Sequence, residues 1–249
     1  MYASDITFDL IKQKYGFKLL YKFSENEGDE VERLAIEKST FCLYSSDWAA
    51  QSAVNTYGKK FEHVFVVPFG ANISELPDYQ PEIKITFKNL KILFLGVDWI
   101  RKGGDIVLKT YQLLKDHGVD VHLTICGCVP PIDLSGTDIT IIPFLNKKNS
   151  DDAKRFDNLL FESQLLFVPS KEDCTPIAFC EAAAYGIPVI SRDEGGISSI
   201  IKNGINGYCL PPAASEQEYF NIISKIAKDK LLYEQLSLNS RKMYLEKLN

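Results

Sequence analysis

Two acidic residues, Asp173 and Glu181, lie eight residues apart around a predicted helix start. Thr175 and Pro176 suit the N-cap and the first position of that helix. The free backbone N–H groups of a helix start can hold an anion. Glu181 is the only charge in the apolar helix that follows, and a buried carboxylate is costly unless it is hydrogen-bonded. The pattern therefore predicts a ligand site.

A plainer interpretation is that Glu181 pairs with a basic side chain and that the loop before the helix has no ligand. An internal ion pair at Glu181 would by itself overturn the ligand site. So would a carboxylate that points away from the edge of the sheet.

A second candidate loop, which is glycine-rich and basic, runs from Gly96 to Gly104 and precedes another helix. Arg101 and Lys102 put positive charge beside the helix start, and the glycines that follow let the backbone approach a ligand closely. This combination suits a diphosphate. The alternative is a basic loop that is only solvated.

The elements that must position these loops alternate between strand and helix from residue 90 onward. We predict strands at Lys91–Leu95, Val121–Ile125, Ile139–Ile142, Leu165–Val168, Ile187–Ile190 and Gly207–Leu210. We predict helices at Asp105–Asp116, Asp151–Glu162, Pro176–Tyr185, Gly196–Lys202 and Glu216–Ala227. This order predicts an α/β fold with a doubly wound parallel sheet, in which ligands bind beyond the carboxyl ends of the strands.

The first part of the chain is less regular. We predict a short helix at Asp5–Lys14, a strand or loop at Phe17–Phe23, and only two convincing strands, at Thr40–Tyr44 and His63–Phe69. Two strands are too few for an independent sheet. We therefore divide the chain into an N-terminal α/β segment (1–72), a linker (73–89) and a C-terminal domain (90–249).

Composition excludes several classes of protein. The net charge of −5 argues against a nucleic-acid partner. The absence of Gly-x-Gly-x-x-Gly argues against a dinucleotide-dependent dehydrogenase, and no stretch is apolar for long enough to span a membrane. The six cysteines fit buried, reduced thiols. Cys126 and Cys128 with His122 do not have the spacing of a common zinc site, so we expect no metal.

The stretch around Glu181 resembles the retaining, nucleotide-sugar-dependent glycosyltransferases of family 4, which have the GT-B fold. The matching residues are Pro169-Ser170, Asp173, Glu181-Ala182, Ala184, Gly186 and Pro188-Val189. The departure is Asp173, where the family has a glutamate. The resemblance implies that residues 90–249 form the C-terminal, Rossmann-like, donor-binding half of that fold.

The resemblance also implies roles for individual residues. Glu181 would accept hydrogen bonds from the two ribose hydroxyls, and Asp173 would hold hydroxyls of the donor sugar. Lys102 matches a lysine of the family, whereas Val97 replaces its arginine, so Arg101 would supply that charge. The backbone near Cys174, Thr175 and Ile177 would face the phosphates, and Gly96 opens the basic loop. Phe144 would flank the nucleobase; a core cap at the end of a strand is an equal alternative.

The implied function is transfer of a sugar from a nucleoside-diphosphate-sugar to a glycan or glycolipid acceptor, in cell-surface polysaccharide biosynthesis. No cofactor is expected, and the absence of Asp-x-Asp leaves the diphosphate to Arg101, Lys102 and the helix start. We expect the chain to lack the first half of the acceptor-side domain and to have little activity alone. The expected location is cytoplasmic, with the full-length protein at the inner face of the membrane. The rivals are a non-catalytic nucleotide-binding scaffold and another GT-B enzyme, such as an epimerase or phosphorylase.

Overall fold

The computed structural model describes residues 1–15, 22–73, 75–79 and 89–249. The chain forms two compact units. The first unit comprises Met1–Phe69, Glu172–Pro176 and Gly195–Ile200, and the second comprises Gly70–Lys171, Ile177–Glu194 and Ile201–Asn249. The first unit therefore includes two short segments from late in the chain. Most of the predicted linker, and the predicted element at Phe17–Phe23 up to residue 21, lie outside the described residues.

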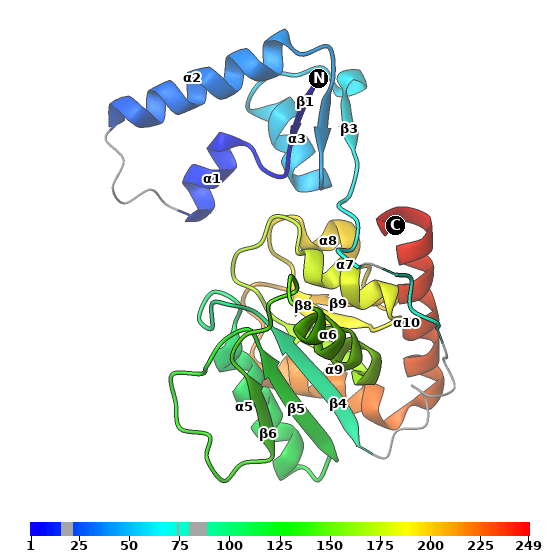
Figure 1. The fold of residues 1–249 in the computed structure, drawn as a ribbon. Helices are drawn as coiled ribbons and strands as arrows, with labels where there is room; N and C mark the ends of the chain where they lie inside the picture. The colour runs from blue at the N-terminus through cyan, green and yellow to red at the C-terminus, as the bar shows by residue number, and fades with distance from the viewer. Residues whose placement is uncertain (16–21, 74, 80–88) are drawn as a thin grey trace. The chain divides into compact units, whose positions relative to one another are not determined.

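The first unit contains a three-stranded parallel sheet in the order β1-β2-β3 (Figure 1). Its strands are β1 (Tyr2–Ser4), β2 (Cys42–Tyr44) and β3 (Val64–Val66). Its helices are α1 (Phe8–Tyr15), α2 (Lys22–Lys38), α3 (Asp47–Asn55), the 3₁₀ turn η1 (Phe61–His63) and α8 (Ile197–Ile200). The expectation of only two strands here is wrong, because the chain begins with a third.

The core of the first unit lies on one face of this sheet. In register, Tyr2 pairs with Cys42 and Cys42 with Val64, and these three side chains face Ile36 of α2 and the alanines of α3. Ser46 caps α3 by accepting a hydrogen bond from the Ala49 N–H at 3.3 Å.

The second unit contains a six-stranded parallel sheet in the order β6-β5-β4-β7-β8-β9. The strands are β4 (Leu90–Leu95), β5 (Val121–Cys126), β6 (Ile139–Ile142), β7 (Leu165–Val168), β8 (Val189–Arg192) and β9 (Gly207–Leu210). Strand order reverses between β4 and β7, which is the switch point of a doubly wound sheet. The predicted fold class and all six predicted strands are confirmed.

Helices cover both faces of the second sheet, with α6 and α7 in front and α5 and α9 behind in the view of Figure 1. Their bounds are α5 (Gly104–Asp116), α6 (Ser150–Glu162), α7 (Ile177–Ala184), α9 (Glu216–Lys228) and α10 (Lys230–Met243), followed by the π-helical turn η2 (Tyr244–Leu248). Because both faces are covered, strands such as β7 are apolar at every position and fully buried.

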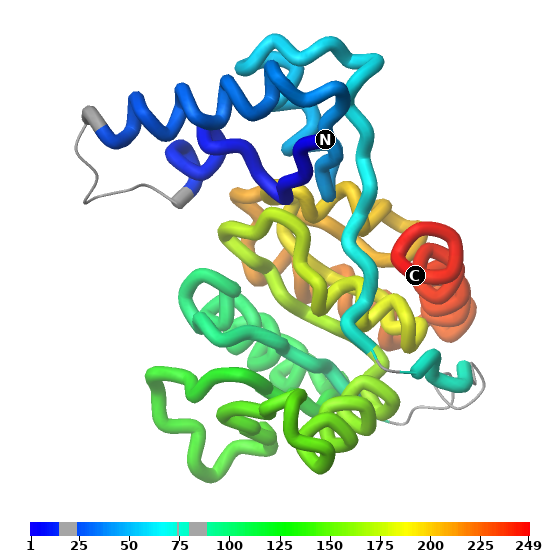
Figure 2. The backbone as a smooth tube through the Cα atoms, turned by 45° about the horizontal axis from the view of Figure 1, so that its top comes forward, coloured from blue at the N-terminus to red at the C-terminus, as the bar shows by residue number. Residues whose placement is uncertain are grey.

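The end of the chain packs on α7 and on the turn that follows it (Figure 2). On α10, Ser237 donates to the Gly186 carbonyl at 2.6 Å and Ser240 donates to the Ile187 carbonyl at 2.9 Å. Ala71 donates its N–H to the Leu248 carbonyl at 3.0 Å. The two serine contacts fix the turn that connects α7 to β8. No helix in the described ranges has both the length and the apolarity to cross a bilayer.

Candidate functional site

A cavity of about 250 Å³ opens in the second unit at the carboxyl ends of β4, β5 and β6. It is lined by Leu95, Gly96, Val97, Lys102, Cys126, Gly127, Phe144, Leu145, Lys147, Phe156, Ala178 and Glu181. The loops after three strands and the start of α7 therefore converge on one hollow. This is the edge at which doubly wound sheets bind ligands.

Glu181 lies on α7 and is 4% exposed, so its carboxylate is almost entirely removed from solvent. Its Oε1 accepts a hydrogen bond from Lys147 Nζ, and the two side chains form an ion pair. Burial raises the pKa of the Glu181 carboxyl, and the hydrogen bond and charge of Lys147 oppose that rise. The plainer interpretation, that Glu181 pairs with a basic side chain, is thus confirmed.

The ion pair does not turn Glu181 away from the cavity, because both partners line it. A carboxylate has two oxygens and about four acceptor positions, so one lysine does not exhaust its capacity. By the criterion stated above, the internal pair alone would overturn the ligand site. That criterion is too strict, because the paired carboxylate still lines the cavity.

Lys147 is the residue that sequence reasoning missed. It follows β6, and its ammonium lies 3.8 Å from the centroid of the Phe156 ring while it also contacts Glu181. The available signal was its position in the 144–148 loop at the carboxyl edge, together with the need of a buried acid for a cation. The pairing itself depends on tertiary packing that the sequence pattern does not reveal.

The basic loop contributes Lys102 and Gly96 to the cavity wall, but Arg101 is not among the lining residues. Arg101 Nε lies 3.7 Å from Asp98 Oδ2, and its carbonyl accepts a hydrogen bond from the Lys171 N–H at 2.8 Å. Gly103 is the N-cap of α5 and has a φ of 77°, and a Cβ there would overlap the Pro169 carbonyl oxygen. Only glycine suits this close approach of two loops.

Phe144 lines the cavity and is 66% exposed, so the alternative that it caps the core is wrong. Ile177 is the first residue of α7 and is 43% exposed. It is the next residue, Ala178, that forms part of the cavity wall.

Asp173, Cys174 and Thr175 belong to the first unit. The Thr175 hydroxyl lies 2.7 Å from the Ser45 hydroxyl, and the Asp173 carbonyl accepts a hydrogen bond from the Gly196 N–H at 3.3 Å. These three residues are not among those that line the cavity. The predicted site residues therefore divide into one group in the cavity and one group packed with the first unit.

The cysteines near the cavity do not form a cluster with His122. Instead, His122 Nε2 lies 3.0 Å from the Thr140 hydroxyl, and His122 Nδ1 lies 3.4 Å from Asp138 Oδ1. Cys126 is buried, and burial raises the pKa of its thiol to about 11. In the part of the chain that the structure describes, no group of three or more histidine, cysteine, aspartate or glutamate side chains could hold a metal ion.

Solved structures share this fold. WaaG, a glycosyltransferase involved in lipopolysaccharide biosynthesis, superposes with a TM-score of 0.71 at 19% identity, covering 96% of this chain and 68% of that one. HepE of Anabaena, solved in complex with UDP and glucose, gives a TM-score of 0.68 at 17% identity, covering 100% of this chain and 67% of that one. The expected relation to the GT-B fold is confirmed.

Sequence comparison agrees with the fold. A D-inositol 3-phosphate glycosyltransferase of Arthrobacter sp. (strain FB24) is 23% identical over 196 residues, which are 72% of this chain and 45% of that protein. The chain thus spans about half the length of this curated relative. The family model "Glycosyl transferases group 1" matches residues 77–243. The chain therefore belongs to the group 1 family of glycosyl transferases.

Proposed function

We propose that this chain contains the donor-binding site of a retaining glycosyltransferase that uses a nucleoside-diphosphate-sugar. The observation that carries the proposal is the cavity in which Glu181, Lys102 and Phe144 meet at the carboxyl edge of the sheet. A buried acid, a cation and an exposed aromatic ring fit the diol, the phosphates and the base of a nucleotide respectively. The complexes of HepE with UDP and with UDP-glucose support this class of ligand.

In this proposal, Glu181 accepts hydrogen bonds from the two ribose hydroxyls and Lys102 binds the diphosphate beside the start of α5. Phe144 stacks on the base, and Gly96 lets the phosphates approach the backbone. Asp173 hydrogen-bonds to the donor sugar, and the backbone around Cys174, Thr175 and Ile177 donates to the phosphates. Arg101 adds positive charge near the same loop. These roles rest on residue chemistry and on the family pattern.

Catalysis would rest on stabilising the departing diphosphate and on positioning the acceptor hydroxyl. We propose that lysine and helix-start N–H groups take up the leaving-group charge, so that no metal is needed. The acceptor would be a glycan or glycolipid in cell-surface polysaccharide biosynthesis. The names of WaaG and of the amylovoran biosynthesis glycosyltransferase AmsK of Erwinia amylovora support that context. A cytoplasmic site of action at the inner membrane face would give access to both substrates.

Calorimetric titration tests the donor site directly. Uridine, guanosine and adenosine diphosphates and their glucose conjugates are titrated against the wild type, Glu181→Gln, Lys102→Met and the control Lys109→Met, an exposed lysine on α5. Losing one charge-assisted hydrogen bond should weaken diphosphate binding by about 10- to 100-fold in the two site variants. The control should bind like the wild type.

The same titration separates the main rival. A non-catalytic nucleotide-binding scaffold that does not use Glu181 would keep equal affinity in Glu181→Gln. Retention is read from the anomeric proton coupling of the product by NMR.

A further inference from the structure

Lys147 occupies a position between two groups that can each bind a cation. Its ammonium contacts the Glu181 carboxylate on α7 and lies 3.8 Å from the centroid of the Phe156 ring on α6. All three side chains line the same cavity. A cation held over an aromatic face remains favourable in a partly desolvated site. Lys147 is therefore held at the acid by two interactions from two elements.

The charged and titratable groups around Glu181 have opposing effects on its pKa. Lys147, from the loop after β6, favours the charged carboxylate. Asp157 on α6 and burial itself favour the neutral form. Asp157 accepts a hydrogen bond from Tyr185 at 3.0 Å, and Cys180 on α7 has a thiol whose pKa burial raises to about 12. Lys102, from the loop before α5, lines the same cavity.

We propose that Lys147 is a positioning residue that keeps Glu181 ionised and aimed into the cavity, ready to accept two hydrogen bonds from a vicinal diol. The diol is the ribose diol of the proposed function, on which this part of the inference rests. Lys147 uses Oε1, which leaves Oε2 and the second lone pair of Oε1 as acceptors. A protonated carboxyl would present one donor and fewer, weaker acceptor positions, so it would bind a diol less tightly.

The Phe156 ring gives this arrangement a second property. When a diol competes for Oε1, Lys147 can keep its contact with the ring and stay within the cavity wall. The lysine then remains close enough to hold the carboxylate charged while the ligand is bound. A lysine held by the carboxylate alone would have to leave for solvent.

The first experiment needs no nucleotide. The pKa of Glu181 is measured by ¹³C NMR of glutamate-labelled protein, and Glu181→Gln identifies the resonance. Lys147→Met should raise the pKa of Glu181 by a unit or more, because burial and Asp157 then act without opposition. Lys147→Arg should stay near the wild type, and Asp157→Asn should lower the pKa. The matched control is Lys148→Met, whose exposed lysine is the next residue. An unchanged pKa in Lys147→Met overturns the proposal.

The second experiment measures affinity against pH, with uridine diphosphate and its 2′,3′-dideoxy analogue as probes. In Lys147→Met, affinity for uridine diphosphate should fall about tenfold per pH unit below the raised pKa and recover above it, because only the ionised acid binds the diol. The dideoxy analogue should bind both proteins alike. An equal loss for both probes at every pH would show a merely structural role and overturn the proposal.

The two experiments also separate this inference from the proposed function. If Glu181 titrates as expected but the wild type binds no nucleoside diphosphate, the proposed function fails while the role of Lys147 as counter-ion stands. Thermal unfolding of Lys147→Met checks that the fold is kept; methionine is a long, unbranched side chain without the charge.

Discussion

The side-chain hydroxyl oxygens of Ser45 and Thr175 lie 2.7 Å apart, although 130 residues separate them in the chain. Both residues are buried, at 2% and 7% exposure. Ser45 follows β2, and Thr175 belongs to the short segment 172–176 that is part of the first unit. Close by, the Asp47 N–H donates to the Ser199 hydroxyl at 3.0 Å. The turn after β2 thus fixes the loop that contains Asp173.

Removing one partner of the Ser45–Thr175 hydrogen bond should destabilise the protein. Each of Ser45→Ala and Thr175→Val leaves a buried hydroxyl without its partner, which costs about 1 to 3 kcal/mol in the free energy of unfolding. The double variant removes both hydroxyls and should cost clearly less than the sum of the two. Urea denaturation of the four proteins measures this coupling. Strictly additive losses would show that the two hydroxyls do not depend on each other.

Gly103 and Gly118 stand at the two ends of α5 and form a matched pair. Both have positive φ, 77° and 70°, but a Cβ at Gly118 would meet no atom within 4 Å, whereas one at Gly103 would overlap Pro169. Gly118→Ala should cost about 1 kcal/mol from the left-handed backbone. Gly103→Ala should cost at least about twice as much, because it also pushes two loops apart. Equal thermal stability of the two variants would contradict this account of Gly103.

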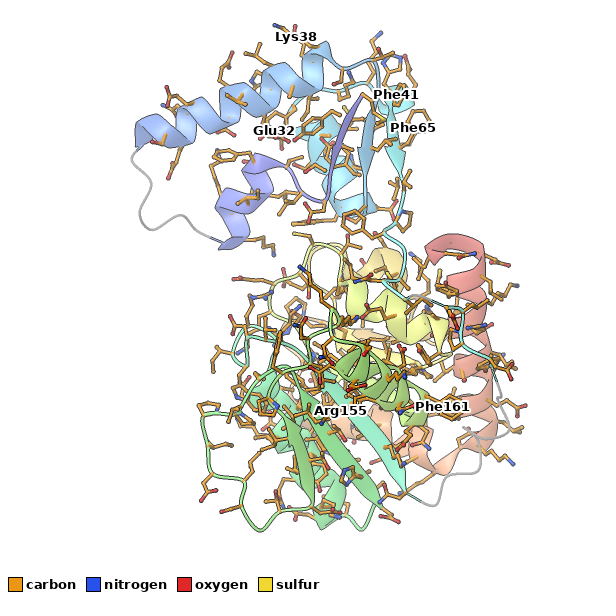
Figure 3. The ribbon with its side chains drawn as sticks, in the orientation of Figure 1. Glu32, Lys38, Phe41, Phe65, Arg155 and Phe161 are labelled. Atoms are coloured by element: carbon orange, nitrogen blue, oxygen red, sulfur yellow. The ribbon has the colours of Figure 1, made fainter. Side chains whose placement is uncertain are left out.

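The stability of the first unit should depend on pH through Glu32. Glu32 lies on the face of α2 that is turned toward the sheet, where Tyr2 donates to its Oε2 at 2.7 Å (Figure 3). Burial raises the pKa of Glu32 above its ordinary value. The folded state therefore binds this proton more tightly than the unfolded chain does. The protonated Glu32 carboxyl therefore contributes to the free energy of unfolding at low pH. This contribution is lost as the pH rises from about 4.3, the pKa in the unfolded chain, through the higher pKa in the folded protein.

Glu32→Gln should flatten that slope, because glutamine can accept the Tyr2 hydrogen bond without becoming charged. Urea midpoints from pH 4 to 8 measure the effect. Glu37→Gln, an exposed position on the same helix, is the control and should retain the slope. The assigned sign would be wrong if the urea midpoint of the wild type rose between pH 4 and 8 relative to that of Glu32→Gln.

Phe41 and Phe65 form an exposed aromatic pair on the sheet of the first unit (Figure 3). Their ring centroids are 6.2 Å apart at 87°, and Phe65 on β3 is 49% exposed. An exposed apolar edge strand promotes association between chains. Phe65→Lys should lower concentration-dependent light scattering and change stability by less than about 0.5 kcal/mol, as surface substitutions usually do. Phe161→Lys, at an exposed phenylalanine on α6, should leave the scattering unchanged.

Much of the second unit could be predicted because a parallel sheet covered on both faces produces continuous apolar runs. Strands such as Leu165–Val168 stand out for that reason, and the turn at Gly186 marks the end of α7. β1 was missed because Tyr2–Ser4 is short, only partly buried and without such a run. Local pattern detects a strand only where burial shapes its composition.

The site was predictable at the level of residue types and not at the level of partners. Glu181, Lys102, Gly96 and Phe144 were identified from the sequence, and all four line one cavity. The partner of Glu181 was not, because any of several basic residues could satisfy a buried acid until the packing of the 144–148 loop is known. The association of Thr175 with Ser45 is likewise a product of tertiary structure.

Asp173 and Glu181 belong to different compact units, and this has a consequence for how damage would affect the protein. Asp173 takes its packing partners from the first unit, whereas Glu181 is anchored within the second. Heat, proteolysis or a destabilising lesion confined to residues 1–69 would release the loop that contains Asp173 and leave the surroundings of Glu181 intact. The contact that we propose between Asp173 and the donor sugar would then be lost before the contact that we propose between Glu181 and the ribose.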